Sequence, residues 1–200
     1  MAVAALVIQG ATPLHAESCD GGPCGAPVYL AVTTGLPAYG ESGFTHGYDA
    51  AIAVGLVGPF GGLFRAELEG GFHVNDAGAV SGSALSGRYD ALSLMANGYI
   101  GFPTFALEPL YPFIGMGFGA ARVDANATAA NGRDTIDGSQ TGFAVQAMAG
   151  FSTAWGVVSY RYFRMPGLEL GLRNGGRIDA DYGSHSIVFT LPFFLGEIGP

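Results

Sequence analysis

The sequence predicts an all-β protein, an eight-stranded antiparallel up-and-down transmembrane β-barrel. Eight stretches alternate apolar residues with small or polar ones, and the gaps between these stretches alternate between short and long. Apolar residues make up 49% of the 200 residues, yet no apolar run reaches the length of about eighteen that a spanning helix requires. A closed barrel crosses a membrane without such a helix, because closure satisfies every backbone hydrogen-bonding group.

The segment 63–74 shows the alternation most clearly. Arg65, Glu67 and Glu69 occupy one set of alternate positions, and Phe64 and Leu68 belong to the other set. A helix would spread these charges around its circumference, whereas a strand with a two-residue period places them on one face. We therefore expect an apolar face toward lipid and a charged face toward the interior.

The same pattern predicts all eight strands, each long enough to cross the hydrocarbon layer when tilted. The predicted strands are 27–36, 47–57, 63–74, 89–102, 110–122, 142–153, 156–164 and 185–195. The residues expected to face the interior include Tyr29, Ala31, Thr33, Asp49, Ala51, Ala53, Gly55, Ser93, Met95, Asn97, Tyr99, Gly115, Gly117, Gly119, Gln146, Met148, Ser159 and Arg161. The residues expected to face lipid include Val28, Leu30, Val32, Ile52, Val54, Leu68, Val74, Leu92, Leu94, Ile114, Met116, Phe118, Phe143, Val158, Tyr160, Ile187, Phe189 and Leu191.

The lengths of the connections predict how the barrel is oriented. The connections after the second, fourth and sixth strands are short: 58–62, 103–109 and 154–155. The other four are longer: 37–46, 75–88, 123–141 and 165–184. Short periplasmic turns and long extracellular loops are typical of bacterial outer-membrane barrels. We therefore expect a bacterial outer-membrane location, both termini in the periplasm, and long loops available to an extracellular ligand.

Aromatic residues gather near both ends of the predicted strands, where amphipathic rings favour the membrane interfaces. Those near the short connections are Phe60, Phe64, Phe102, Phe105, Tyr111, Phe113, Phe151, Trp155 and Phe193. Those near the long connections are Tyr48, Phe72, Tyr89, Phe118, Phe143 and Tyr162. We expect these two sets to form the two aromatic girdles of a membrane barrel.

The N-terminal segment predicts export. Residues 2–8 form a short apolar core and Ala16 is a plausible cleavage position, so residues 1–16 resemble a secretory signal peptide that lacks its basic start. Residues 17–26 would form a periplasmic segment in which Cys19 and Cys24 can close a small disulfide loop. The barrel domain would then span 27–195, followed by a tail at 196–200.

An eight-stranded barrel has a lumen just wide enough for side chains to fill. We predict a buried polar network in this lumen, with Arg161 paired to Glu67 or Glu69. Its other members are Arg65, Asn97 and Gln146, with Ser159 close by. Charges in this setting must be paired, because an uncompensated buried charge costs several kcal/mol. A satisfied barrel core explains this set better than a proton path or an acid–base pair does.

Composition narrows the range of functions. Only 12% of the residues are charged, the net charge is −8 and all eight basic residues are arginines, which argues against a nucleic-acid surface. We expect no cofactor and no metal, because the acidic residues of 123–141 and 165–184 match no known calcium-loop spacing.

Three stretches resemble small outer-membrane β-barrels of the opacity-protein, or outer-membrane-protein-A-like, superfamily. Pro112–Gly119 resembles the fifth-strand signature of that group, and Ser159–Arg164 resembles its tyrosine-arginine-tyrosine strand. His185–Leu195 is similar to its closing strand. The resemblance implies the eight-stranded fold over about 27–195. Members of the superfamily include adhesins, host-interaction proteins and envelope-stabilising barrels, so it implies the fold more than a function.

Three functions compete on these observations. The first is a non-enzymatic outer-membrane barrel whose long loops serve surface interaction or envelope integrity, with outer-membrane lipids as its surroundings. The second is a membrane-embedded lipid-modifying enzyme, for which Ser184, His185 and Ser186 form the only serine–histidine cluster. Adjacent residues of a strand point to opposite faces, which weakens that cluster. The third is a soluble lipocalin-like ligand-binding barrel with its apolar face inward.

Overall fold

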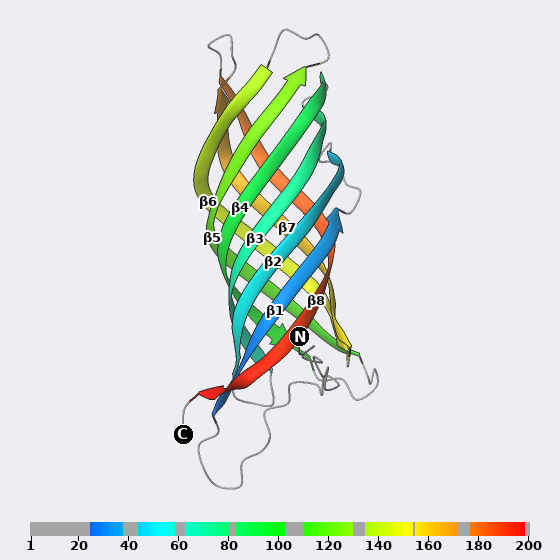
Figure 1. Ribbon diagram of the computed structural model, residues 1–200, viewed down its shortest axis with the longest axis vertical. Helices are drawn as coiled ribbons and strands as arrows, with labels where there is room; N and C mark the ends of the chain where they lie inside the picture. The colour runs from blue at the N-terminus through cyan, green and yellow to red at the C-terminus, as the bar shows by residue number, and fades with distance from the viewer. Residues whose placement is uncertain are drawn as a thin grey trace, which may run out of the picture.

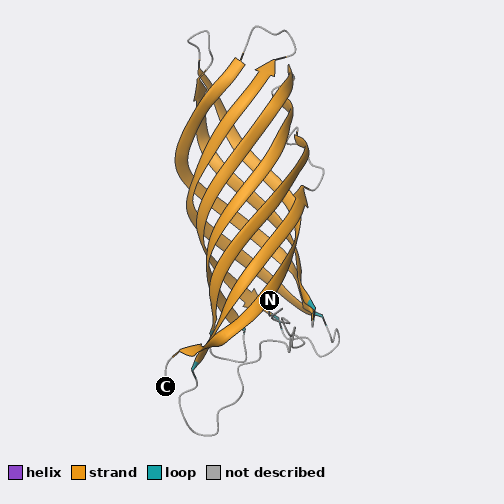
Figure 2. Cartoon of the chain, in the orientation of Figure 1, coloured by secondary structure: helices purple, strands orange, loops and turns teal. Residues whose placement is uncertain are grey.

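The structure is a computed structural model that describes residues 25–37, 44–58, 63–80, 83–102, 110–129, 135–153, 155–171 and 177–198. These residues form one tall barrel of strongly tilted strands (Figure 1). Strand is the regular structure throughout the described part of the chain (Figure 2). No helix within these ranges is long and apolar enough to cross a membrane.

Eight antiparallel strands close the barrel in sequence order, and β1 pairs with β8. The strands are β1 Ala26–Pro37, β2 Phe44–Val57, β3 Phe64–Val80, β4 Ser83–Gly101, β5 Tyr111–Ala129, β6 Thr135–Thr153, β7 Gly156–Gly171 and β8 Arg177–Ile198. The predicted fold class is therefore confirmed.

The two ends of the barrel differ. We call the end that carries the connections 58–63, 102–110 and 153–156 the turn end, and the opposite end the rim end. The described chain begins and ends at the turn end. Most of the predicted strands start or stop within three residues of the observed limits at the turn end. The connection before β7 is tight, and Gly156 there has a φ of 151°, a conformation that other residues rarely adopt.

The rim end extends much further than predicted. The sequence prediction placed loops at 75–88, 123–141 and 165–184, but strand covers all of these ranges except 81–82, 130–134 and 172–176, which lie outside the described residues. In the predicted loop 37–46, Pro37 belongs to β1 and 44–46 belong to β2, and 38–43 lie outside the described residues. β8 also continues past the expected end at Leu195, and Gly196 and Ile198 still pair with β1. The predicted loops were too long because the strands continue beyond the part whose outward residues are apolar.

Burial alternates along every strand as the two-residue period predicts. Leu68, Leu94 and Ile114 are more than half exposed on the outside, while Tyr29, Met95 and Ser159 are buried inside. Val74 is an exception, because it was expected to face lipid and is only 5% exposed. Its neighbours in register are Tyr48 on β2 and Asp90 on β4.

Two aromatic residues predicted for the girdles lie inside the barrel instead. Phe113 is buried with Tyr99 and Met148, and Tyr89 is buried with Ala91. Phe113 shares the inward face of Gly115, and Tyr89 shares that of Ala91 and Ser93, so strand periodicity decides their direction and nearness to a strand end does not. Phe60 and Phe105 lie outside the described residues.

The described part of the lumen is filled in three layers. Buried apolar residues occupy the rim half, among them Phe163, Met165, Leu168 and Tyr182. Two smaller apolar clusters lie toward the turn end, around Tyr29 and around Tyr99. Buried polar and charged side chains lie between these layers, namely Asp49, Glu69, His73, Asn97, Gln146 and Arg161.

The expected signal peptide, the segment 17–24 and the Cys19–Cys24 disulfide lie outside the described residues. They remain predictions.

Candidate functional site in the barrel lumen

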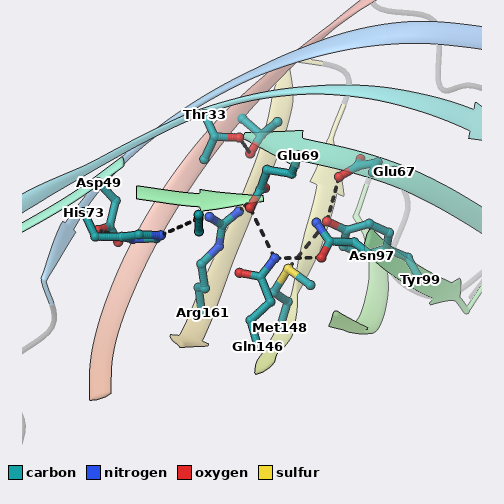
Figure 3. Close-up of polar contacts among 12 residues, drawn as sticks. Thr33, Asp49, Glu67, Glu69, His73, Asn97, Tyr99, Gln146, Met148 and Arg161 are labelled. Carbon is teal, nitrogen blue, oxygen red and sulfur yellow. Dashed lines mark hydrogen bonds and ion pairs between the residues drawn. The ribbon is translucent and has the colours of Figure 1, made fainter. Parts of the chain in front are cut away.

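The polar layer of the lumen brings together side chains from β2, β3, β4, β6 and β7. Figure 3 shows them converging from opposite walls of the barrel. Each side chain sits at an inward position of its strand, which the alternation of the sequence fixes. The residues that meet are far apart in the sequence, so the closure of the barrel creates the layer.

Arg161 and Glu69 form the centre of the layer. The Nη2 atom of Arg161 donates to Glu69 Oε2 across 2.7 Å, and both side chains are buried. Gln146 Nε2 donates to Glu69 Oε1 at 3.2 Å and to Asn97 Oδ1 at 2.7 Å. Nε and Nη1 of Arg161 have no acceptor among the described residues. Glu69 is therefore the carboxylate that compensates this buried guanidinium (Figure 3).

Glu67 occupies a separate site nearer the turn end. The hydroxyl of Tyr29 donates to its Oε1 at 2.6 Å, and the hydroxyl of Tyr99 donates to its Oε2 at 2.7 Å. The guanidinium of Arg65 lies over the rings of Tyr99 and Phe113, 5.0 and 5.2 Å from their centroids. This geometry is that of cation–π contacts. Two phenols and a stacked arginine therefore surround Glu67.

A third group joins three neighbouring strands. His73 Nδ1 is 2.9 Å from Asp49 Oδ1, and His73 Nε2 is 3.3 Å from Ser93 Oγ. The ring of Phe163 stacks on His73 with centroids 4.6 Å apart. Toward the rim, Asn75 donates to the hydroxyl of Tyr182.

The order Ser93–His73–Asp49 is that of a catalytic triad, which is recognised by geometry and not by sequence position. A triad needs a substrate beside its nucleophile. Here each of the three side chains is at most 4% exposed, beneath the apolar layer of Phe163 and Tyr182. The three residues therefore tie β2, β3 and β4 together without an open approach to Ser93 Oγ.

The six predicted lumen residues thus divide between two sites. Glu69, Asn97, Gln146 and Arg161 share one hydrogen-bonded network, whereas Glu67 and Arg65 belong to the phenol site. The sequence prediction did not include Tyr29, Asp49, His73 or Tyr99 in the network. All four lie on predicted inward faces, so listing every inward polar or phenolic residue would have found them. Within the described ranges no group of three or more histidine, cysteine or acidic residues could hold a metal.

Glycines on β5 make room for this network. A Cβ atom on Gly117 would lie 2.0 Å from Asn97 Oδ1 and 3.1 Å from Gln146 Cγ. Gly115 faces the ring of Tyr99 in the same way. Side chains that join the network therefore fill the space beside Gly115 and Gly117.

We expect Gly117→Ala to destabilise the barrel by about 1–3 kcal/mol, because the added methyl displaces Asn97 from Gln146. The measurement is the free energy of unfolding in lipid vesicles by urea titration. Gly98→Ala is the matched control, because an added Cβ at this exposed glycine meets nothing within 4 Å. Equal stability of the two variants would contradict this account of the β5 glycines.

The serine–histidine cluster of β8 is divided between the two sides of the wall. Ser184 and Ser186 are buried in the lumen, with their hydroxyl oxygens 3.5 Å apart. His185 lies beside Tyr162 with ring centroids 4.7 Å apart, and its Nδ1 atom is hydrogen-bonded to the hydroxyl of Tyr160. Because neither serine shares the face of His185, these residues do not form a nucleophile–base pair.

Solved structures provide a comparison for the whole barrel. Neisserial surface protein A has a TM-score of 0.51 and 16% identity, and the match covers 84% of this chain and 97% of that one. The chain has the fold of a small outer-membrane β-barrel. This confirms, at the level of the fold, the resemblance carried by Pro112–Gly119, Ser159–Arg164 and His185–Leu195.

A second crystal structure, that of Ail, the attachment invasion locus protein of Yersinia pestis, has a TM-score of 0.47 and 15% identity. The match covers 84% of this chain and 99% of that one. The sequence itself matches no protein-family model and no curated protein.

Proposed function

We propose that this protein is a non-enzymatic barrel of the bacterial outer membrane, with a filled lumen and a rim that acts at the cell surface. With the rim end at the cell surface, the turn end and both termini lie in the periplasm. The rim would bind an external ligand or contribute to the integrity of the envelope. The observation that carries the proposal is the apolar exterior of a closed barrel.

The apolar exterior surrounds the barrel over the part nearest the turn end. Met116 is 74% exposed and Leu68 is 58% exposed, and Leu92, Leu94, Ile114 and Phe118 are also exposed on the outside. A soluble protein rarely exposes an apolar patch of more than a few hundred Å². This exterior favours lipid as the surroundings and argues against the soluble lipocalin-like alternative.

The rim end supports a role at the surface. Outward positions there become polar, as at Arg88, Asp90, Arg122 and Asp124, so the strands continue into water above the lipid. Long extracellular extensions and short periplasmic turns are the usual arrangement in such barrels. The neisserial neighbour is named as a surface protein, which agrees with this placement.

The lumen supports a non-conducting and non-catalytic barrel. Its rim half is packed with buried apolar side chains, and its middle is occupied by the Arg161–Glu69 pair and by hydrogen-bonded polar side chains. The lipid-modifying alternative needs a nucleophile and a base that reach lipid together. The separation of His185 from Ser184 and Ser186, and the burial of Ser93, argue against that alternative.

The first experiment is fractionation of expressing cells, followed by electrophoresis of the outer-membrane fraction with and without boiling. We expect the protein in that fraction, and we expect the unboiled sample to migrate differently because a closed barrel resists unfolding. Protease added to intact cells should cut only in the segments between strands at the rim end. A soluble protein without the mobility shift, or cleavage confined to the turn end, would overturn the proposal.

A further inference from the structure

A separate cluster of polar residues lies on the outside of the barrel, near the rim end. It consists of outward residues of three adjacent strands: Arg88 and Asp90 on β4, Arg122, Asp124 and Asn126 on β5, and Ser139 on β6. The register places Asp90 opposite Asp124, and Asp124 opposite Ser139. Residues from three strands therefore meet in one exterior patch, which we call the outer polar patch.

Two arginine–aspartate pairs run along the strands of the outer polar patch. Arg88 Nε donates to Asp90 Oδ1 at 2.7 Å, and Arg122 Nη2 lies 3.3 Å from Asp124 Oδ1. Arg122 Nη2 also donates to Ser139 Oγ at 3.1 Å. Two carboxylates directly opposite each other on neighbouring strands repel. Each arginine pairs with the aspartate on its own strand and so offsets that repulsion. Both arginines remain about half exposed.

The surface between these strands is hollowed. A hollow of about 640 Å³ is lined by Arg88, Asp90, Asp124, Asn126 and Ser139, together with small residues. Guanidinium, carboxylate, amide and hydroxyl groups thus face one space. The hollow is open to the exterior of the barrel.

The hollow lies directly above the apolar exterior. The next outward pair toward the turn end after Asp90 and Asp124 is Leu92 and Arg122. Phe118 and Phe143 follow, and both are well exposed. Alternate residues of a strand are separated by about 7 Å. The outer polar patch therefore lies at the level where lipid headgroups begin.

The outward-facing arginines whose side chains the structure describes lie in the rim half of the barrel. Among the described residues, Arg88, Arg122 and Arg164 are exposed on the outside, and all three lie toward the rim end, whereas Arg161 is inside the lumen and Arg65 faces inward. The corresponding level at the turn end is lined by apolar and aromatic residues such as Phe64, Phe102 and Trp155. The two interfaces thus present different chemistry to the two leaflets.

We propose that the outer polar patch binds the phosphorylated sugar headgroup of an outer-leaflet glycolipid. The two arginines would bind phosphate oxygens, for which the guanidinium geometry is suited. Asp90, Asp124, Asn126 and Ser139 supply acceptors and donors for sugar hydroxyls, and their two carboxylates make the patch a poor site for a purely anionic ligand. The proposal rests on the outer-membrane placement proposed above.

Native mass spectrometry of the purified full-length barrel in detergent micelles tests this proposal. The probes are lipid A, which carries phosphates on a sugar headgroup, phosphatidylglycerol, which carries a phosphate without a sugar, and inorganic phosphate. We expect lipid A to bind more tightly than phosphatidylglycerol and to resist displacement by inorganic phosphate. Replacing both arginines in the Arg88→Gln/Arg122→Gln variant should weaken lipid A binding about tenfold or more.

Arg164→Gln is the matched control, because Arg164 is an exposed arginine on β7, away from the hollow. We expect its affinity for lipid A to stay within about twofold of the wild type, since it removes one positive charge away from the hollow. Equal binding of phosphatidylglycerol, displacement by inorganic phosphate, unchanged binding in the double variant, or an equal loss in Arg164→Gln would each overturn the proposal. Heat-dependent mobility of every variant shows folding, and fractionation separately tests the outer-membrane placement.

Discussion

Replacing Arg161 with methionine should cost about 3–5 kcal/mol of folding stability, because the change leaves the Glu69 carboxylate buried without its cation. Among the described residues, only Gln146 then remains to donate to Glu69. Glu69→Gln should have a comparable effect, because the two remaining nitrogens of Arg161 have no described acceptor. The measurement is the free energy of unfolding by urea in lipid vesicles.

The double variant Glu69→Gln/Arg161→Met should be more stable than either single variant. Removing both charges abolishes the uncompensated one, and buried pairs replaced in this way often lose little stability. Glu67→Gln/Arg161→Met is the matched control, because Glu67 is held by Tyr29 and Tyr99. Its two effects should add. Additive losses for Glu69 and Arg161, or strong coupling between Glu67 and Arg161, would contradict the observed pairing.

Leu68→Arg should destabilise the barrel by about 2–4 kcal/mol in a bilayer, because the proposed membrane placement puts this outward position against the hydrocarbon. Leu68 is outward on β3, midway between Phe64 and Phe72, and pairs with Val54 and Ala96. The measurement is the same urea titration in vesicles.

The control for depth is Thr141→Arg. Thr141 is an exposed outward residue paired with Arg122 at the headgroup level. An arginine there should cost about 0–1 kcal/mol. The same cost at both positions, or a stabilised Leu68→Arg variant, would show that the apolar exterior does not contact lipid.

The sequence alone determined the number of strands and the direction of nearly every side chain. The two-residue period forces successive side chains to opposite faces, so one clear strand such as 63–74 establishes which residues are inside. Where the prediction departed from this period, it failed. Phe113 and Tyr89 were assigned to the girdles by their nearness to strand ends, yet the period places both in the lumen.

The length of the strands at the rim end was decided by pairing with neighbouring strands and could not be predicted from the sequence. Toward the rim end, outward positions become polar at Arg88, Asp90, Arg122 and Asp124, while inward positions such as Val123 and Ala125 stay buried and apolar or small. Charged and glycine-rich outward positions hide the strand period in the sequence. Backbone pairing with the neighbouring strands nevertheless continues there.

The pairing inside the lumen was decided by the tertiary structure alone. Glu67 and Glu69 share one face of one strand, and the sequence offers both to Arg161. The tilt and register of the closed barrel bring Glu69 within 2.7 Å of Arg161 and place Glu67 between two tyrosines. A strand period determines on which side of the wall a residue lies, but only the closure of eight tilted strands determines which residues meet across the lumen.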